Sequence, residues 1–150
     1  MLNSIVKFCA TFCYVGTFPF ASGTMASAAG VVIYFLLYAQ ISAYILVTVG
    51  ITVVGFLVAG RMEKILNKKD PSWVVIDEVS GILITLFLLP PTIPVIVTAF
   101  FVFRAFDMFK IYPANKWEAA GGGTGIMMDD IIAGLYANIV MQVALQIINV

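Results

Sequence analysis

The chain contains no histidine, and only 11% of its residues are charged. It therefore lacks a histidine general base, a phosphohistidine intermediate and any metal site that needs an imidazole ligand. A metal would have to be held by oxygen atoms, which favours Mg²⁺, Mn²⁺ or Ca²⁺. Cys9 and Cys13 are spaced i, i+4 rather than as CxxC, which argues against a redox pair and a zinc site. The net charge of zero argues against a nucleic-acid partner bound by a basic surface.

Charge is also missing from long stretches of this 150-residue chain, which is 62% hydrophobic. No charged residue occurs from Met25 to Gly60. A helix crosses the hydrocarbon of a bilayer with about 20 residues, so this stretch predicts two helices joined by a tight turn near Gln40 and Ser42. Helices satisfy their own backbone hydrogen bonds in lipid. The composition therefore predicts an all-α integral membrane protein, with a single domain over residues 1–150.

The rest of the chain predicts a small polytopic bundle. Further helices are expected over residues 72–89, 95–111 and 128–150. Glycine and proline between residues 14 and 23 predict an irregular segment, re-entrant or interfacial, with a helix starting near Thr24. On the last helix, Asn138, Gln142 and Gln146 recur at steps of four and are expected to hydrogen-bond to neighbouring helices. The expected architecture is thus about five helices preceded by an irregular N-terminal segment.

The charged residues are distributed unevenly over this expected bundle. The turns near residues 40 and 92 carry no charge, whereas all eight lysines and arginines fall on the opposite side. Lysine and arginine concentrate in the cytoplasmic loops of membrane proteins. The charged side is therefore predicted to face the cytoplasm.

Five acidic residues on that side are candidates for chemistry. They are Asp77, Glu78, Asp107, Asp129 and Asp130. A charged group costs about 2.5–3.5 kcal/mol at the centre of a membrane helix on insertion scales, so such groups are retained when they bind or pair. Arg104 and Lys110 can neutralise two of the acids, and the remaining three suit a divalent cation. An alternative is that Asp129 and Asp130 only cap the last helix, but the convergence of three more acids favours metal binding.

A glycine-rich stretch precedes these last two aspartates. Gly121, Gly122, Gly123 and Gly125 allow the backbone to curl and to point N–H groups at a phosphate before a helix begins. No Gly-Lys-Ser/Thr follows, so the stretch is not a Walker A loop. Beside an acid cluster and two cations, it predicts a site that handles a phosphoryl group, with Mg²⁺ held by oxygen ligands.

Four blocks of sequence narrow this prediction further. In chain order they are SGTMAS (22–27), VIDEVSG (75–81), FRAFDMFKIYPA (103–114) and GGTGIMMDDIIAG (122–134). Together they resemble the bacterial phosphatidylglycerophosphatase A family. The resemblance implies a small, multi-pass, Mg²⁺-dependent phosphatase of the bacterial cytoplasmic (inner) membrane. Its expected substrate is phosphatidylglycerophosphate, which loses its terminal phosphate to give phosphatidylglycerol.

Joined to the charge argument, the resemblance implies a role for each acid. Glu78, Asp129 and Asp130 are expected to hold Mg²⁺. Asp77 and Asp107 are expected to serve as a further ligand and a water-orienting base. With no histidine and no CxxxxxR loop, direct attack by water is favoured over an aspartyl-phosphate intermediate.

The expected phosphate contacts combine side chains and backbone. Arg104 and Lys110 are expected to bind the phosphate oxygens. Backbone N–H groups are expected to assist, from Gly122, Gly123, Thr124 and Gly125. The oligomeric state is left open.

Two other functions compete with this interpretation. A small cation transporter or channel would use the same acids as an ion path, but it would need charge at several membrane depths and an exit route. A lipid phosphotransferase of the CDP-alcohol type also uses Mg²⁺ and aspartates, but its aspartate-glycine-arginine spacing is absent. A lipid phosphatase acting on a different phospholipid is a further alternative.

Overall fold

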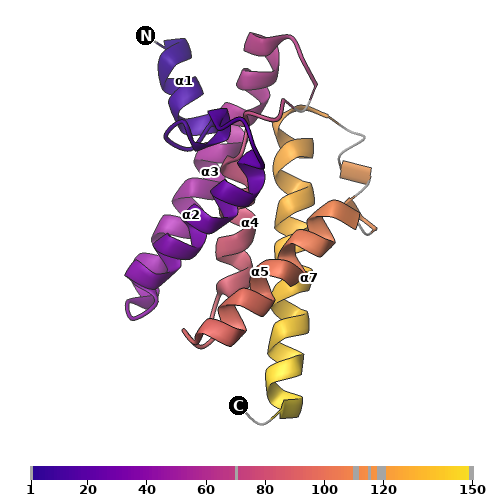
Figure 1. Cartoon of the computed structure of the whole chain (residues 1–150). Coiled ribbons are helices and arrows are strands. Elements are labelled where there is room, and N and C mark those ends of the chain that lie inside the picture. The colour runs from indigo at the N-terminus through magenta and orange to yellow at the C-terminus, as the bar shows by residue number, and fades with distance from the viewer. Residues whose placement is uncertain (1, 70, 110–111, 115, 118–120, 149–150) are drawn as a thin grey trace.

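The computed structural model describes residues 2–69, 71–109, 112–114, 116–117 and 121–148, and these ranges contain helices and no strand, as predicted. The elements are α1 (Leu2–Ala10), a 3-10 turn η1 (Val15–Thr17), α2 (Ser22–Leu37), α3 (Ile41–Leu66), α4 (Ile76–Leu86), α5 (Ile93–Phe109) and α7 (Gly122–Ile148) (Figure 1). The helices form one bundle in which α4 occupies the middle.

The first predicted hairpin is confirmed. The uncharged run folds as α2 and α3, and the three residues between them include Gln40 at the expected turn. Tyr34 and Tyr44 meet edge to face across this hairpin, with ring centroids 5.9 Å apart. The Tyr34 hydroxyl also donates to the carbonyl oxygen of Leu89, at 2.6 Å, which ties the hairpin to the connection after α4.

Helix α4 is almost wholly buried among its neighbours, and glycines allow the closest approach. A Cβ added at Gly134 of α7 would lie 2.5 Å from the carbonyl oxygen of Gly81, so the two backbones nearly touch. Asn138 donates from Nδ2 to the carbonyl oxygens of Thr85 and Phe87, at 2.8 Å each. The predicted role of Asn138 as a contact between helices is therefore confirmed.

Two predicted helix starts are wrong, and both errors affect the site. Helix α4 begins at Ile76 rather than near Ser72, so Asp77 and Glu78 lie in its first turn and not one to two turns inside. Helix α7 begins at Gly122 rather than near Met128, so most of the glycine-rich stretch is helical and not a loop.

The N-terminal segment is partly as predicted. Residues 11–21 are irregular apart from η1, and Phe12, Cys13 and Tyr14 have positive φ angles of 44°, 56° and 68°. Helix α1 precedes this segment, and α2 starts two residues before the expected Thr24.

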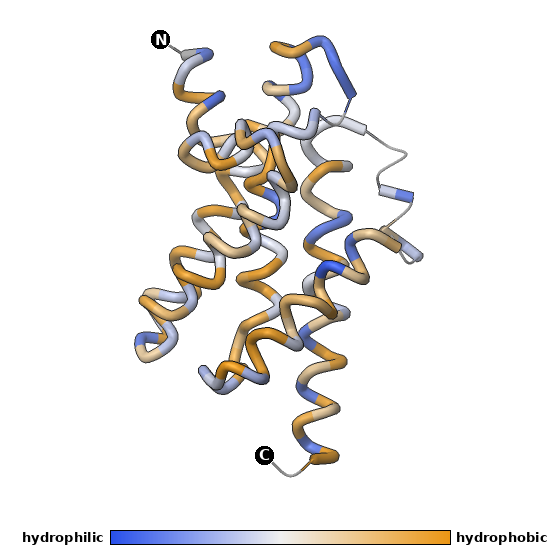
Figure 2. Tube along the Cα trace, viewed as in Figure 1, coloured by the Kyte–Doolittle hydropathy of each residue, from blue (hydrophilic) through white to orange (hydrophobic). Residues whose placement is uncertain are grey.

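Helices α3 and α7 are long and apolar enough to cross a membrane, by length and composition. Only 17% and 22% of the residues in their most apolar windows are buried inside the protein. A core helix of a soluble protein would instead be mostly buried, so this exposed apolar surface supports membrane association. The connection from α3 to α4, which is the most hydrophilic part of the trace, lies at the same end of the bundle as α1 and the start of α7 (Figure 2).

Candidate active site

A cavity of about 210 Å³ lies beside the first turn of α4. Its lining is formed by Ser22, Ser72, Val74, Asp77, Glu78, Asp107, Asp129 and Asp130. All five acids that were singled out from the sequence therefore meet at one cavity. They come from three helices that are distant in the chain: α4 supplies two, α5 supplies one and α7 supplies two.

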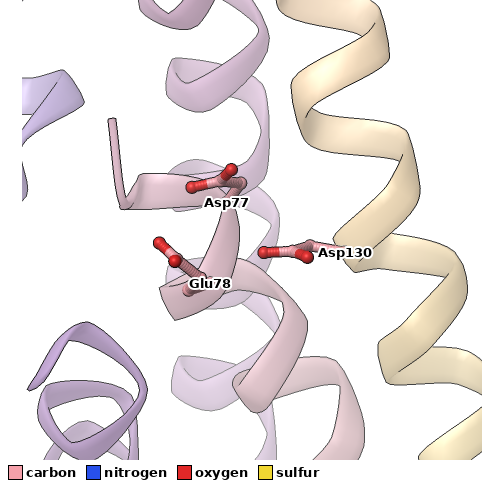
Figure 3. A group of neighbouring side chains, drawn as sticks. All are labelled: Asp77, Glu78 and Asp130. Carbon is pink, nitrogen blue, oxygen red and sulfur yellow. The ribbon is translucent and has the colours of Figure 1, made fainter. Parts of the chain in front are cut away.

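Three of these carboxylates lie close enough to share one cation. Oxygen atoms of Asp77, Glu78 and Asp130 all lie within 4.8 Å of one another (Figure 3). Asp77 and Glu78 project from the first turn of α4, and Asp130 reaches toward them from α7. Oxygens bound to one octahedral Mg²⁺ lie roughly 2.9–4.2 Å apart, given metal–oxygen distances of about 2.1 Å. Small side-chain movements would therefore bring this oxygen-only donor set to the geometry that Mg²⁺ requires.

The burial of these acids also fits a cation. Asp130 is 2% exposed, and Oε2 of Glu78 is buried without a hydrogen-bond partner among the described residues. Adjacent carboxylates repel one another, and their burial removes the water that would screen them. A divalent cation would offset both costs.

One cation of the protein already reaches this cluster. Arg104 Nη1 of α5 lies 2.7 Å from Oδ2 of Asp107 and 4.0 Å from Oε1 of Glu78. Asp107 thus fixes the guanidinium, one turn away on the same helix, beside a candidate metal ligand. Lys110, the other predicted phosphate contact, lies outside the described residues.

The glycines at the start of α7 do not line the acidic cavity. Gly122, Gly123, Thr124 and Gly125 form the first turn of the helix, and none of them lines the acidic cavity. The start of α7 is about 10 Å from Asp129 along the helix axis, at 1.5 Å per residue. Gly121 and Gly122 instead line a separate cavity with Lys64, Lys68 and Lys69. Their contact with the substrate phosphate stays a prediction.

Two uncharged polar residues and one glycine at the site were not predicted from the sequence. Ser22 and Ser72 line the cavity, and the Ser22 hydroxyl donates to the carbonyl oxygen of Ser72 at 3.0 Å. A Cβ on Gly23 would lie 2.1 Å from Oε1 of Glu78, so a larger residue there would displace that carboxylate. Ser22 and Gly23 lie in the block SGTMAS, one of the four that carry the family resemblance, whereas Ser72 lies in none of these blocks.

Comparison with known proteins assigns the family. The sequence model of the phosphatidylglycerophosphatase A family matches residues 8–145, which is nearly the whole chain. The chain belongs to the phosphatidylglycerophosphatase A family. It is accordingly a phosphatase, as the four sequence blocks predicted.

Three relatives illustrate the range of this family. A phosphatidylglycerophosphatase A of Escherichia coli is 34% identical, with 80% of this chain and 72% of the relative covered. Its counterpart in Haemophilus influenzae is 30% identical, with 81% and 77% covered. A protein of Bacteroides thetaiotaomicron that is named as a candidate phosphatidylinositol-3-phosphatase is 36% identical, with 89% of both chains covered. No solved structure shows significant similarity to the chain.

Proposed function

We propose that this protein is a Mg²⁺-dependent lipid phosphatase that hydrolyses phosphatidylglycerophosphate to phosphatidylglycerol and phosphate. The observation that supports this proposal best is the group formed by Asp77, Glu78 and Asp130 beside Arg104. Three clustered carboxylates bind a divalent cation, and an adjacent guanidinium binds a phosphate. The two relatives named phosphatidylglycerophosphatase A support the choice of substrate.

The residues present fit Mg²⁺, because every donor in the cluster is a carboxylate oxygen. Asp77, Glu78 and Asp130 would hold the ion. When bound, the ion would neutralise charge on the phosphate oxygens and make the phosphorus more electrophilic. Asp77 thereby takes the ligand position that the sequence analysis gave to Asp129.

The remaining polar side chains would act on the phosphate and on water. Arg104, held by Asp107, would bind the non-bridging phosphate oxygens through its planar fork. Asp129 lines the cavity but lies outside the three-oxygen cluster. It is therefore suited to accept the proton of the attacking water. The water oxygen bonds to phosphorus as the bond between phosphorus and the lipid alcohol oxygen breaks. The leaving oxygen takes up the proton held by Asp129, which releases the lipid alcohol and inorganic phosphate.

We place the cavity at the cytoplasmic face of a bacterial inner membrane, in a multi-pass chain. The support is the distribution of charge over the bundle. The turns 38–40 and 87–92 contain no charged residue, and they lie at the end of the bundle opposite α1 and the α3–α4 connection. Positive charge concentrated at one end favours a cytoplasmic position for that end.

A second substrate deserves a direct comparison. The Bacteroides relative matches more of this chain than the other two, and its name refers to a different phospholipid monoester. Phosphatidylinositol 3-phosphate is therefore the second candidate. Both substrates are phosphate monoesters on a polyol headgroup, so the site proposed above would hydrolyse either of them by the same steps.

One experiment tests these proposals together. Purified protein in detergent is given each lipid with Mg²⁺, and phosphate release is measured before and after addition of EDTA. We expect release from phosphatidylglycerophosphate that EDTA abolishes and excess Mg²⁺ restores. Release that EDTA does not change would contradict the metal assignment. A kcat/KM that is higher for phosphatidylinositol 3-phosphate would make the second candidate the substrate.

A further inference from the structure

The hydroxyl of Ser22 stands out among the groups that line the acidic cavity. Five of the eight lining residues are acids and one is Val74, which leaves Ser22 and Ser72 as the uncharged polar positions. Ser22 is the first residue of α2, and its side chain is only half-buried. A group that enters the cavity can therefore contact Ser22 without repulsion from a carboxylate.

The hydrogen bond that Ser22 makes defines what it can recognise. Its hydroxyl donates to the carbonyl oxygen of Ser72 at 3.0 Å, and a carbonyl can only accept. The single proton of this hydroxyl is therefore in use, whereas its oxygen keeps lone pairs to accept further hydrogen bonds. A phosphate oxygen, which also accepts, is a poor partner for such a group. The hydroxyl of a substrate, which donates, is a good one.

Ser22 also adjoins the groups proposed to hold the metal and the phosphate. The next residue, Gly23, packs so closely on Glu78 that an added Cβ would lie 2.1 Å from Oε1 of that carboxylate and 3.3 Å from Nη1 of Arg104. Glu78 and Arg104 are the groups assigned above to the metal and to the phosphate. Ser22 therefore lines the cavity next to the position proposed for the phosphate, where a headgroup atom near the phosphoester would reach it.

We propose that Ser22 is a specificity-determining residue that accepts a hydrogen bond from a substrate hydroxyl. This hydroxyl is on the carbon next to the one that bears the phosphate. The inference rests on the proposed function and adds the class of headgroup. Phosphatidylglycerophosphate and phosphatidylinositol 3-phosphate both carry a hydroxyl at that position. Phosphatidic acid carries an acyl ester there and cannot donate. Ser22 thus favours phosphate monoesters of polyol headgroups over phosphatidic acid.

The test compares kcat/KM for phosphatidylglycerophosphate and for phosphatidic acid with matched acyl chains, in mixed micelles with Mg²⁺. We expect Ser22→Ala to lower the ratio of the two values about two- to thirteenfold, since one hydrogen bond contributes about 0.5–1.5 kcal/mol. Ser22→Thr keeps the hydroxyl and should restore the ratio. Ser42→Ala, which changes an exposed serine at the start of α3 outside the cavity, is the matched control and should leave the ratio unchanged.

Each outcome separates the inference from the function beneath it. If the unsubstituted protein releases phosphate from neither lipid, the proposed function fails. If it releases phosphate but Ser22→Ala keeps the same ratio, the assignment of Ser22 is overturned. An equal loss of kcat/KM on both lipids in Ser22→Ala would show that the hydroxyl only supports the fold. This result would also overturn the assignment of Ser22.

Discussion

Asp129 and Asp130 are neighbours on α7, yet their carboxylates have different surroundings. Asp130 is 2% exposed and belongs to the three-oxygen cluster with Asp77 and Glu78. Asp129 lines the same cavity outside that cluster, and its Oδ1 accepts a hydrogen bond from the backbone N–H of Asp130 at 3.0 Å. Adjacent residues on a helix point about 100° apart, which explains how a pair of aspartates can divide two roles.

Separate substitution of these aspartates should therefore have different kinetic effects. We expect Asp130→Asn to raise the Mg²⁺ concentration for half-maximal activity at least about tenfold, because the cluster would lose one of its proposed charged ligands. Asp129→Asn should lower kcat and leave the Mg²⁺ dependence unchanged, because it would remove the proposed base and no proposed ligand. Initial rates over a Mg²⁺ titration check both statements. A similar shift in Mg²⁺ dependence for both variants would contradict the division of roles.

At the scale of the elements, apolar patterning predicted the helices better than their ends. The uncharged run that gives α2 and α3 is too long for one crossing, so its division at Gln40 was predictable. The start of α7 was not, because glycine costs about 1 kcal/mol per residue in a helix relative to alanine. Here a close contact overrides that preference: a Cβ on Gly60 of α3 would lie 2.8 Å from the backbone nitrogen of Gly123. Tertiary packing thus extends the helix where local propensity predicted a loop.

In the candidate site, too, some residues could be predicted from the sequence and others could not. The five acids were predictable because charge is costly in an apolar chain and is therefore conspicuous there. The position of Ser22 was not predictable, because serine is common at helix starts whether or not the residue lines a site. It reaches the cavity through the packing of α2 on α4, which depends on glycines: a Cβ on Gly30 would lie 2.3 Å from Cγ2 of Ile82. Contacts of this kind are set by the whole bundle.

The contact between α4 and α7 gives a prediction at this scale. Gly134→Ala places a Cβ 2.5 Å from the carbonyl oxygen of Gly81, and a backbone atom cannot move aside as a flexible side chain does. We expect a loss of about 1–3 kcal/mol in stability, as for other overpacked sites. Gly50→Ala is the control, because no atom lies within 4 Å of its added Cβ. Thermal unfolding in detergent should show a lower Tm for Gly134→Ala alone, and equal Tm values would contradict the packing argument.

The helices of the bundle differ in length, and the acidic cavity lies some distance from the charged end of the bundle. Helices α3 and α7 contain 26 and 27 residues and are each about 40 Å long, which exceeds the hydrocarbon thickness of about 30 Å. Helix α4 contains 11 residues and is only about 16 Å long. It begins further inside the bundle than the charged end at which α3 ends (Figure 1), and Asp77 and Asp130 near its start are buried, so the acids are recessed from that end. Such a recess suits a phosphate that is carried on a lipid anchored in the same bilayer.

The orientation of this bundle can be tested with single cysteines. Cys9 and Cys13 are first replaced by alanine, and one cysteine is then introduced, as Lys68→Cys at the charged end or as Gln40→Cys in the uncharged turn. Both positions are exposed and lie outside the acidic cavity. In intact bacterial cells, a membrane-impermeant maleimide should label Gln40→Cys and spare Lys68→Cys if the positive end faces the cytoplasm, as proposed. Lys68→Cys should become labelled once the inner membrane is permeabilised, which shows that its thiol is accessible. The reverse pattern would place the acidic cavity at the outer face of the membrane and would contradict the proposed orientation.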